Sequence, residues 1–363
     1  MKFIDIEAQQ KKIRQPIESA IKRVLDHGKY IMGPEVMQLE EALSQFVDSR
    51  HCIAVANGTD ALLIAMMALD IGPGDEVIAP AFSYIAALEM IVFLGATPVL
   101  VDVDERTFNL DVSKLESAIT SKTKAIVPVN LFGQCCDFDA INQIAKKHNL
   151  PVIEDAAQSM GATYKGRRSC HLSTIATTSF FPAKPLGCYG DGGACFTDDD
   201  ELAERMKQIH VHGQAQKYQH VRVGMNSRLD TIQAAILLEK LKIFPEEIEL
   251  RQQVADRYNT GLGTNIQLPF VEAFGRSVYA QYVIRLEDRD SAMLALKKQG
   301  IPSIVHYPEP LHKQPAYKEQ IICSDKLFTS EELSGQVLSL PMHPYINASQ
   351  QDLIIETLVS ELN

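Results

Sequence analysis

The sequence predicts an α/β protein built on a mainly parallel sheet that helices cover on both faces. Short apolar runs rich in β-branched residues alternate with helical patterns through the first two thirds of the chain. Continuous apolar strands of this kind are typical of sheets buried on both faces. The chain has 363 residues, more than one domain usually contains, so we expect a large domain and a smaller one.

The expected elements of the large domain follow in a regular order. Apolar runs predict strands at residues 52–56, 76–79, 97–103, 125–129, 151–154, 177–181 and 194–197. Helical patterns between them predict helices at 61–69, 84–94 and 139–148. The alternation of strand and helix predicts a seven-stranded, mainly parallel sheet.

A long helical pattern at 229–258 leads out of this region. Beyond it the chain mixes a strand at 279–286, a helix at 290–299 and loops, which is typical of a smaller α+β domain. We therefore expect a large domain at 1–245 and a small C-terminal domain at 246–363. Because no flexible linker separates them, the two domains are expected to pack closely.

The composition narrows the classes of function and location. A formal net charge of −11 argues against nucleic-acid binding, which normally uses a basic face. The N-terminus is charged where a signal peptide is apolar, and the apolar run at 86–94 is too short to span a membrane. We therefore expect a cytoplasmic protein without a membrane partner. Seven cysteines without paired C-x-x-C spacing indicate reduced thiols and no metal site.

The first polar motif, Asn57-Gly-Thr-Asp60, lies between a predicted strand and a predicted helix. Backbone N–H groups at a helix N-terminus form an anion site when a residue such as Gly58 allows close approach and a hydroxyl such as Thr59 assists. The same residues also fit a plain N-cap formed by Thr59 or Asp60. Taken alone, the motif leaves both interpretations open.

The second polar motif, Glu154-Asp-Ala-Ala-Gln158, closes the strand predicted at 151–154. A carboxylate shielded from water is costly unless it meets a cation. A protonated pyridine nitrogen would supply that cation, and Asp155 would in turn keep the nitrogen protonated. Asp155 also fits the N-cap of the following turn, so this motif alone is ambiguous too.

The third polar motif, Ser179-Phe-Phe-Pro-Ala-Lys184-Pro-Leu-Gly, precedes the glycine-rich segment 190–193. Pro185 disfavours a helical conformation at Lys184, so we expect the lysine in an extended loop that leaves a strand. A solvated lysine is the commonest fate of this residue type. Among apolar and glycine residues, however, desolvation lowers the pKa of a lysine and favours the neutral amine that forms an imine.

In combination these motifs resemble the DegT/DnrJ/EryC1/StrS sugar aminotransferases. The resemblance rests on Asn57-Gly-Thr-Asp-Ala-Leu62, Glu154-Asp-Ala-Ala-Gln158, Ser179-Phe-Phe-x-x-Lys184, Gly190-Asp-Gly-Gly-Ala194 and Gly224-Met-Asn-Ser-Arg-Leu-Asp230. It runs from Met1 almost to the C-terminus. It implies an aminotransferase of fold type I that uses pyridoxal 5′-phosphate and glutamate.

The resemblance also implies roles for single residues in holding the cofactor. Lys184 would carry it as a Schiff base and later move a proton, while Asp155 would pair with the pyridine nitrogen. Gln158 would contact the phenolic oxygen of the ring. The remaining contacts are implied for Gly58, Thr59 and Ser179 at the phosphate, for Phe82 stacked on the ring, and for Asn226 reaching the phosphate from the neighbouring subunit of a homodimer. Phe82 also fits ordinary core packing.

Within the family, several segments are similar to enzymes that act on a UDP-linked 3-keto-N-acetylhexosaminuronic acid in surface-polysaccharide (O-antigen) biosynthesis. These segments are 27–35, 131–139, 179–194, 280–282 and 305–315. Such enzymes transfer the amino group of glutamate to the C3 ketone. The resemblance then implies that the sugar nucleotide contacts Gly28, Tyr30, Ala183, Arg228, His306 and Tyr307. Ala183 departs from the Ser or Thr of the relatives, which leaves only a backbone contact there.

Four alternatives compete with this interpretation. The acceptor could be another keto-sugar nucleotide, such as a 4-keto-6-deoxy sugar, because few side chains decide the acceptor. Lys184 argues against the family's dehydratases, which carry histidine at this position. A nicotinamide oxidoreductase would need G-x-G-x-x-G after the first strand, and the motif at 57–60 does not supply it. Nothing in the sequence indicates the DNA-binding domain of an inactive regulator.

Overall fold

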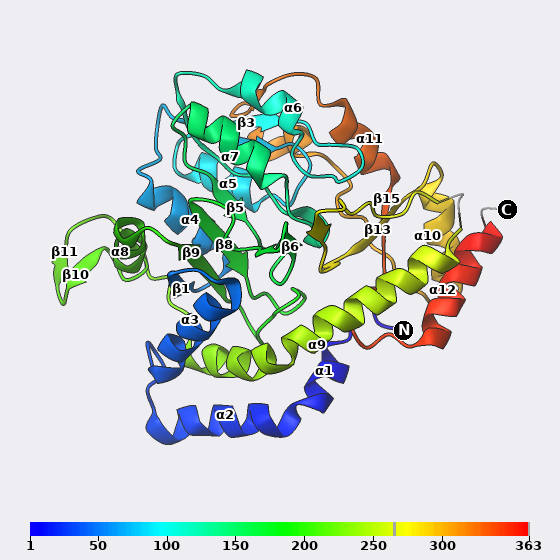
Figure 1. Cartoon of the computed structure of the whole chain (residues 1–363), viewed down its shortest axis with the longest axis horizontal. Helices are drawn as coiled ribbons and strands as arrows, with labels where there is room; N and C mark the ends of the chain where they lie inside the picture. Colours follow the sequence, from blue (N-terminus) through cyan, green and yellow to red (C-terminus); the bar gives the residue numbers. More distant parts are fainter. Residues whose placement is uncertain (264–265, 362–363) are drawn as a thin grey trace.

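The chain folds into the predicted alternation of strands and helices, with further helices at both ends (Figure 1). The structure is a computed structural model that describes residues 1–263 and 266–361. The helices are α1 (Ile6–Lys12), α2 (Arg14–His27), α3 (Pro34–Val47), α4 (Gly58–Ala68), α5 (Ala86–Phe93), α6 (Val112–Leu115), α7 (Phe138–Lys147), α8 (Asp200–Ile209), α9 (Thr231–Gly261), α10 (Arg289–Lys298), α11 (Phe328–Gln336) and α12 (Ala348–Glu361).

The strands of the central sheet are β1 (His51–Val55), β2 (Glu76–Pro80), β3 (Thr97–Val101), β4 (Thr123–Ile126), β5 (Ile153–Asp155), β8 (Ile175–Ser179), β9 (Gly193–Thr197) and β14 (Ile322–Cys323). The strands outside it are β6 (Thr163–Tyr164), β7 (Arg167–Arg168), β10 (Gln214–Gln216), β11 (Gln219–His220), β12 (Gly275–Arg276), β13 (Tyr282–Arg285) and β15 (Val337–Leu340). All the strands predicted for the large domain are therefore present.

The central sheet is mainly parallel. Its two halves have the strand orders β1-β9-β8-β5 and β14-β3-β2-β4. Parallel bridges between Ile126 and Val152 and between Val129 and Asp155 join β4 to β5, so the halves form one sheet. Only β9 runs antiparallel to its neighbours, β1 and β8. The predicted fold class is confirmed, with β14 as an additional edge strand.

Alternating strand residues pack into two separate cores, one on each face of the sheet. In β1, Cys52 and Ala54 belong to one apolar cluster, whereas Ile53 and Val55 belong to the other. Successive side chains of a strand point to opposite faces, so these two clusters show that both faces are covered. This arrangement explains why the strands read as continuous apolar runs in the sequence.

The C-terminal part has an apolar core of its own, formed by residues between Val254 and Leu358. Helix α9 runs without interruption across residue 245, although Pro245 lies inside it. In Figure 1, α9 extends from beneath the sheet to α10 and α12, at the opposite end of the molecule from the β10–β11 hairpin. Strand β14 returns to the large sheet and pairs with β3. A division at residue 245 stays a prediction.

Several predicted boundaries shift in the structure. The strand expected to reach residue 103 ends at Val101, because Val103 forms only an isolated bridge with Leu110. The strand expected at 279–286 shortens to Tyr282–Arg285. All seven cysteines are free. Within residues 1–263 and 266–361, no helix combines the length and apolarity needed to cross a bilayer.

Candidate active site

Three of the predicted cofactor residues, Gly58, Asp155 and Ser179, lie where central strands end. Strand β5 ends at Asp155, β8 ends at Ser179, and the loop after β1 leads into α4 at Gly58. Because β5 and β8 are parallel neighbours, their carboxyl ends lie at the same edge of the sheet. Ligands of open α/β sheets bind at this edge.

Lys184 lies within electrostatic reach of Asp155, which is buried at the end of β5. Burial raises the pKa of Asp155, while the N–H of Ala157 and the charge of Lys184 act in the opposite direction. Burial lowers the pKa of Lys184, and the charge of Asp155 acts against this effect. The pair therefore combines an amine with an increased neutral fraction and a carboxylate that a further cation would stabilise.

The backbone around Lys184 differs from the extended loop that the sequence predicts. The N–H of Lys184 donates a hydrogen bond of 2.8 Å to the carbonyl of Phe181, which closes a turn directly after β8. Pro185 follows this turn and is buried. The restriction that Pro185 places on Lys184 therefore still allows a closed turn.

Gly58, Ser179 and Gly193 form a closely packed cradle at the N-terminus of α4. A Cβ atom on Gly58 would lie 2.6 Å from Cβ of Ser179, and one on Gly193 would lie 2.5 Å from the carbonyl of Asn57. Only glycine fits at either position. The side chain of Asn57 accepts a hydrogen bond of 2.8 Å from the N–H of Asp60. Asn57 is therefore the N-cap, in place of the expected Thr59 or Asp60.

Gln158 connects this region to the C-terminal part of the chain. Its side-chain oxygen accepts a hydrogen bond of 2.8 Å from the N–H of Phe132, and its amide nitrogen donates one of 3.1 Å to the hydroxyl of Tyr307. Phe82, which is 1% exposed, packs edge-on against both Phe132 and Tyr307. The structure thus brings Phe82, Gln158 and Tyr307 together, as a shared site requires.

His306 lies beside Tyr307 and within electrostatic reach of Lys184. Its Nδ1 is 2.8 Å from the hydroxyl of Ser339. Burial, together with the charge of Lys184, lowers the pKa of His306 to about 4. The imidazole is therefore neutral near pH 7 and can donate or accept a hydrogen bond without adding charge.

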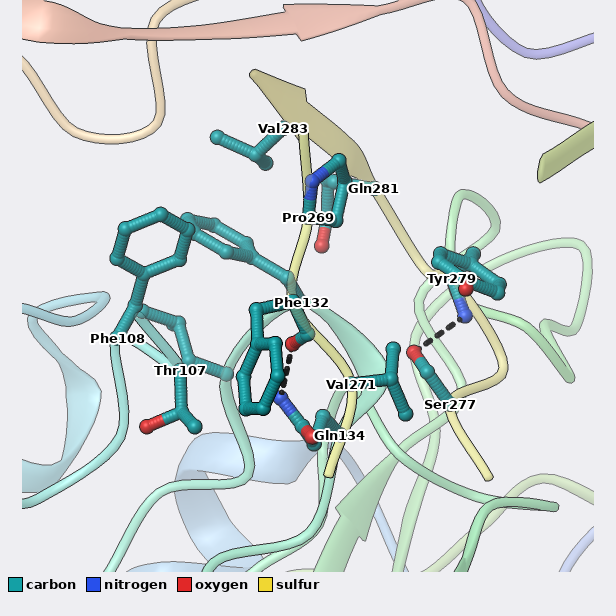
Figure 2. A pocket seen from close by; sticks show the side chains of 12 residues that line it. Thr107, Phe108, Phe132, Gln134, Pro269, Val271, Ser277, Tyr279, Gln281 and Val283 are labelled. Carbon is teal, nitrogen blue, oxygen red and sulfur yellow. Dashed lines mark hydrogen bonds between the residues drawn. The ribbon is translucent and has the colours of Figure 1, made fainter. Parts of the chain in front are cut away.

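A pocket adjoins Phe132 on the side of the C-terminal part of the chain. Figure 2 shows Phe108, Phe132 and Gln134 on one side of it and Pro269, Val271 and Gln281 on the other. None of the predicted site residues lines this pocket. Its lining residues Phe108, Phe132 and Val283 belong to the same apolar cluster as Phe82.

Arg228 and Asn226 lie in a segment that is fixed to the loop after β1. The N–H of Ala56 donates a hydrogen bond of 3.2 Å to the hydroxyl of Ser227, which stands between them. Asn226 is exposed, whereas Nε of Arg228 is buried without a hydrogen-bond partner. An unpaired guanidinium N–H in a segment bound to the loop after β1 fits a carboxylate or a phosphate.

Tyr30 reaches the same region from the N-terminal helices. Gly28 ends α2 with a φ of 67°, a left-handed conformation that favours glycine. Two residues later, the carbonyl of Tyr30 accepts a hydrogen bond of 3.0 Å from the N–H of Thr231, while the Tyr30 side chain is 48% exposed. Ala183 is partly exposed within the turn before Lys184. The carbonyl contact with Thr231 therefore ties the segment of Tyr30 to the start of α9.

Sequence reasoning missed His210, which lies close to Arg228. Burial lowers the pKa of His210 to about 4, with the nearby charge of Arg228 as a smaller cause. Its Nδ1 is buried without a hydrogen-bond partner. His210 follows an ordinary amphipathic helix, α8, so no sequence pattern distinguishes it from a structural histidine.

Comparison with known proteins identifies relatives whose matches extend over nearly the whole chain. The model of the DegT/DnrJ/EryC1/StrS aminotransferase family matches residues 11–359. A UDP-2-acetamido-2-deoxy-3-oxo-D-glucuronate aminotransferase from Pseudomonas aeruginosa is 57% identical over 361 residues, which cover 99% of this chain and 100% of the relative. A dTDP-3-amino-3,6-dideoxy-alpha-D-galactopyranose transaminase from Aneurinibacillus thermoaerophilus is 42% identical and covers 98% of both chains.

Solved structures share the same fold. The X-ray structure of DesV from S. venezuelae has a TM-score of 0.97 and 40% sequence identity, and the match covers 100% of this chain and 98% of DesV. The PLP form of Spr1654 from Streptococcus pneumoniae has a TM-score of 0.90 and 30% identity, with 96% of both chains covered.

Proposed function

This chain belongs to the DegT/DnrJ/EryC1/StrS aminotransferase family, and we propose that it transfers the amino group of glutamate to the C3 ketone of UDP-2-acetamido-2-deoxy-3-oxo-glucuronate. The chain is an aminotransferase, and its cofactor is pyridoxal 5′-phosphate. The observation that carries the proposed acceptor is the 57% identity, over practically the full length of both chains, with an aminotransferase named for this keto-sugar.

Two features of the chain fit the cofactor. The cradle of Gly58, Ser179 and Gly193 at the N-terminus of α4 suits a phosphate, because glycine permits close approach and a helix N-terminus attracts anions. Buried Asp155 suits a protonated pyridine nitrogen, because burial penalises a carboxylate that has no nearby cation. When bound, the cofactor supplies an electron-accepting ring that carries the amino group between the two substrates.

The chain's own residues then have the following proposed roles. Nζ of Lys184 would hold the cofactor covalently, and the free amine would move a proton to and from the reacting substrate carbon. Its lowered pKa favours the neutral amine that both tasks require. Asp155 would stabilise positive charge on the ring nitrogen. Gln158 and Phe82 would hold the ring, while Gly58, Thr59, Ser179 and the partner's Asn226 would hold the phosphate.

We assign the sugar nucleotide to the surface formed by Gly28, Tyr30, Ala183, Arg228, His306 and Tyr307. The acceptor carries a carboxylate and a diphosphate, and the unpaired Nε–H of Arg228 is a suitable donor for either group. Neutral His306 offers a hydrogen bond beside the amine of Lys184 without repelling it. Glutamate then uses the same Lys184 in the other half of the reaction.

We further propose a cytoplasmic homodimer that functions in surface-polysaccharide (O-antigen) biosynthesis. Several large apolar side chains are exposed, namely Tyr30, Ile31, Met32, Tyr84, Phe181, Val221 and Val223. Burial of such side chains by another chain would remove apolar surface from water. A second copy on this surface would bring its Asn226 to the phosphate.

The test is a glutamate-dependent assay against a panel of UDP- and dTDP-linked keto sugars, read by mass spectrometry. We expect amino transfer to the 3-keto uronic acid to exceed transfer to 4-keto-6-deoxy sugars. Lys184→Ala should abolish both this transfer and the fixation of the cofactor by borohydride. Preferred turnover of a 4-keto-6-deoxy sugar would overturn the acceptor, and transfer retained by Lys184→Ala would overturn the mechanism.

A further inference from the structure

We propose that Lys240 is a positioning residue for Lys184, which it acts on through the carbonyl of Gly187. This role of Lys240 rests on the function proposed for Lys184, the reactive lysine of the loop that Lys240 contacts. Lys240 belongs to α9, more than fifty positions away in sequence, and nothing in the resemblance or in the comparisons assigns it a role.

The ammonium group of Lys240 is buried against the lysine loop. Lys240 is 1% exposed, and its Nζ donates a hydrogen bond of 2.6 Å to the carbonyl of Gly187. The same Nζ lies 4.3 Å from the centroid of the Tyr189 ring, a cation–π contact. The charge of Lys240 is thus held between two residues that follow Lys184 by three and five positions.

Gly187 transmits this contact to the turn that contains Lys184. A Cβ atom on Gly187 would lie 2.6 Å from the carbonyl oxygen of Phe181 and 2.7 Å from that of Pro182. The backbone at Gly187 is therefore in close contact with the backbone at 181–182. The same carbonyl of Phe181 accepts the hydrogen bond from the N–H of Lys184. A shift of Gly187 therefore displaces the acceptor that closes the turn.

A second residue of α9 supports the same loop. The side chain of Gln233 accepts a hydrogen bond of 2.9 Å from the N–H of Tyr189 and donates one of 3.4 Å to its carbonyl. Gln233 and Lys240 are seven residues apart and so share one face of the helix. This face of α9 thus supports the loop at Tyr189 and at Gly187.

Glu247, two further turns along the same face, is the acidic group that faces Lys240. Glu247 is 1% exposed, accepts hydrogen bonds of 2.8 and 2.9 Å from the amide of Gln9, and also accepts one from the hydroxyl of Tyr345. Burial lowers the pKa of Lys240 to about 8, and the charge of Glu247 acts against this effect.

Burying an ammonium group costs free energy, because the charge loses its contact with water. Well-packed apolar residues in place of buried charges are often neutral or stabilising. Stability alone would therefore favour an apolar side chain such as methionine at position 240. Methionine has no hydrogen-bond donor for the carbonyl of Gly187. The donor that Lys240 supplies fixes the position and orientation of the turn at Lys184.

The test compares Lys240→Met with the matched control Lys242→Met. Lys242 lies on the same helix, but its side chain is 66% exposed and pairs with Glu239, so the control removes a surface charge without touching the loop. Hydrogen–deuterium exchange of the cofactor-free proteins reports on residues 180–190. Single-turnover reaction of the holoenzyme with glutamate reports on Lys184, and titration with UDP reports on nucleotide binding.

In Lys240→Met we expect faster exchange at residues 180–190 and a single-turnover rate constant lower by roughly 10- to 100-fold, because small displacements of a reacting group have effects of this size. The dissociation constants of glutamate and UDP should stay within about threefold, since Lys240 touches neither. Lys242→Met should match the wild type in every measurement.

Unchanged exchange at residues 180–190, or an unchanged rate constant in a variant with only a lower melting temperature, would overturn the proposal and leave Lys240 a structural residue. If Lys240→Met fails to fold, Lys240→Gln replaces it, with an intermediate loss expected and wild-type behaviour overturning the proposal. A wild type that does not react with glutamate would instead refute the proposed function, so the two failures are distinguishable.

Discussion

At the residue scale, the site depends on two buried ionisable groups, Asp155 and Lys184. Burial shifts their pKa values in opposite directions. Burial raises the pKa of Asp155 and lowers that of Lys184, so each group is shifted toward its neutral form while their mutual attraction opposes both shifts. A cationic ring nitrogen beside Asp155 would take over as its partner. Lys184 would then be free to act as a neutral amine, which is the form that reacts.

Arg228 permits a prediction at this scale. Arg228→Ala removes the unpaired guanidinium from the proposed acceptor site and leaves Lys184 and Asp155 in place. Loss of one charge-assisted contact should weaken binding of the UDP-sugar by about 1.5–3 kcal/mol, or roughly 10- to 150-fold. Titration calorimetry with the UDP-linked amino sugar measures the affinity, and the absorbance spectrum of the bound cofactor should stay the same.

Arg257→Ala is the control for Arg228→Ala, because Arg257 pairs with Asp352 on the surface of the C-terminal part. This variant should bind the UDP-sugar as the wild type does. If Arg228→Ala releases the cofactor instead of the sugar nucleotide, the role assigned to Arg228 is wrong.

At the element scale, Asp102 follows strand β3 directly and binds the N-terminus of helix α11. Its carboxylate is 1% exposed and accepts hydrogen bonds from the N–H groups of Thr329 and Ser330, at 3.0 and 2.9 Å. Asp102 therefore caps a helix more than two hundred residues away in sequence. Burial alone would raise the pKa of Asp102, but the hydrogen bonds from Ser330, Thr329 and Val103 outweigh it and lower the pKa.

Asp102→Asn should lower the free energy of unfolding by about 1–3 kcal/mol at pH 7, because an amide leaves buried N–H donors poorly paired. The pKa of Asp102 is lower in the folded state than in the unfolded state, where it is about 3.9. Asp102 therefore contributes fully to the unfolding free energy above the unfolded-state pKa, and this contribution is lost as the pH falls through the folded-state pKa. The difference from the wild type should thus shrink below about pH 4. Urea titrations followed by circular dichroism measure the unfolding free energy of both proteins at each pH.

The control for this prediction is Asp290→Asn, at a side chain that is 82% exposed. It should change the unfolding free energy by less than about 0.5 kcal/mol. A difference between Asp102→Asn and the wild type that grew on acidification would contradict the assigned role of Asp102.

At the scale of the whole molecule, the proposed homodimer makes each site depend on both chains. Asn226 is exposed and lies next to Ser227, which is bound to the loop after β1. If Asn226 serves the partner's phosphate site, a chain that lacks Lys184 can still complete the site of a chain that lacks Asn226. Complementation between two inactive variants therefore tests the shared site.

Asn226→Asp places a negative charge near the phosphate and should inactivate the homodimer, as Lys184→Ala does. Unfolding and refolding the two variants together should restore about a quarter of the wild-type activity, because half of the dimers are mixed and each has one intact site. Each variant treated alone is the control. Absence of recovery, with mixed dimers detected by native mass spectrometry, would place Asn226 in the site of its own chain.

The sequence by itself determined the fold class, the order of the strands along the chain and the chemistry of the site. Buried parallel strands must be apolar on both faces, so their positions are visible as runs such as 76–79. The roles proposed for Lys184 and Asp155 come from the resemblance to the family, because the local pattern around each residue alone left a second interpretation open. The resemblance itself is confirmed by the family model that matches residues 11–359.

Only the tertiary structure decided which distant segments meet. The reversal of β9, the pairing of β14 with β3, and the contact of Lys240 with Gly187 join residues that share no local pattern. Lys240 lies in a long helix and His210 directly follows an amphipathic one, and no helical pattern in a sequence indicates what these side chains will contact. Local preferences act over a few residues, whereas burial and hydrogen bonding at the site depend on neighbours that only the packed chain supplies.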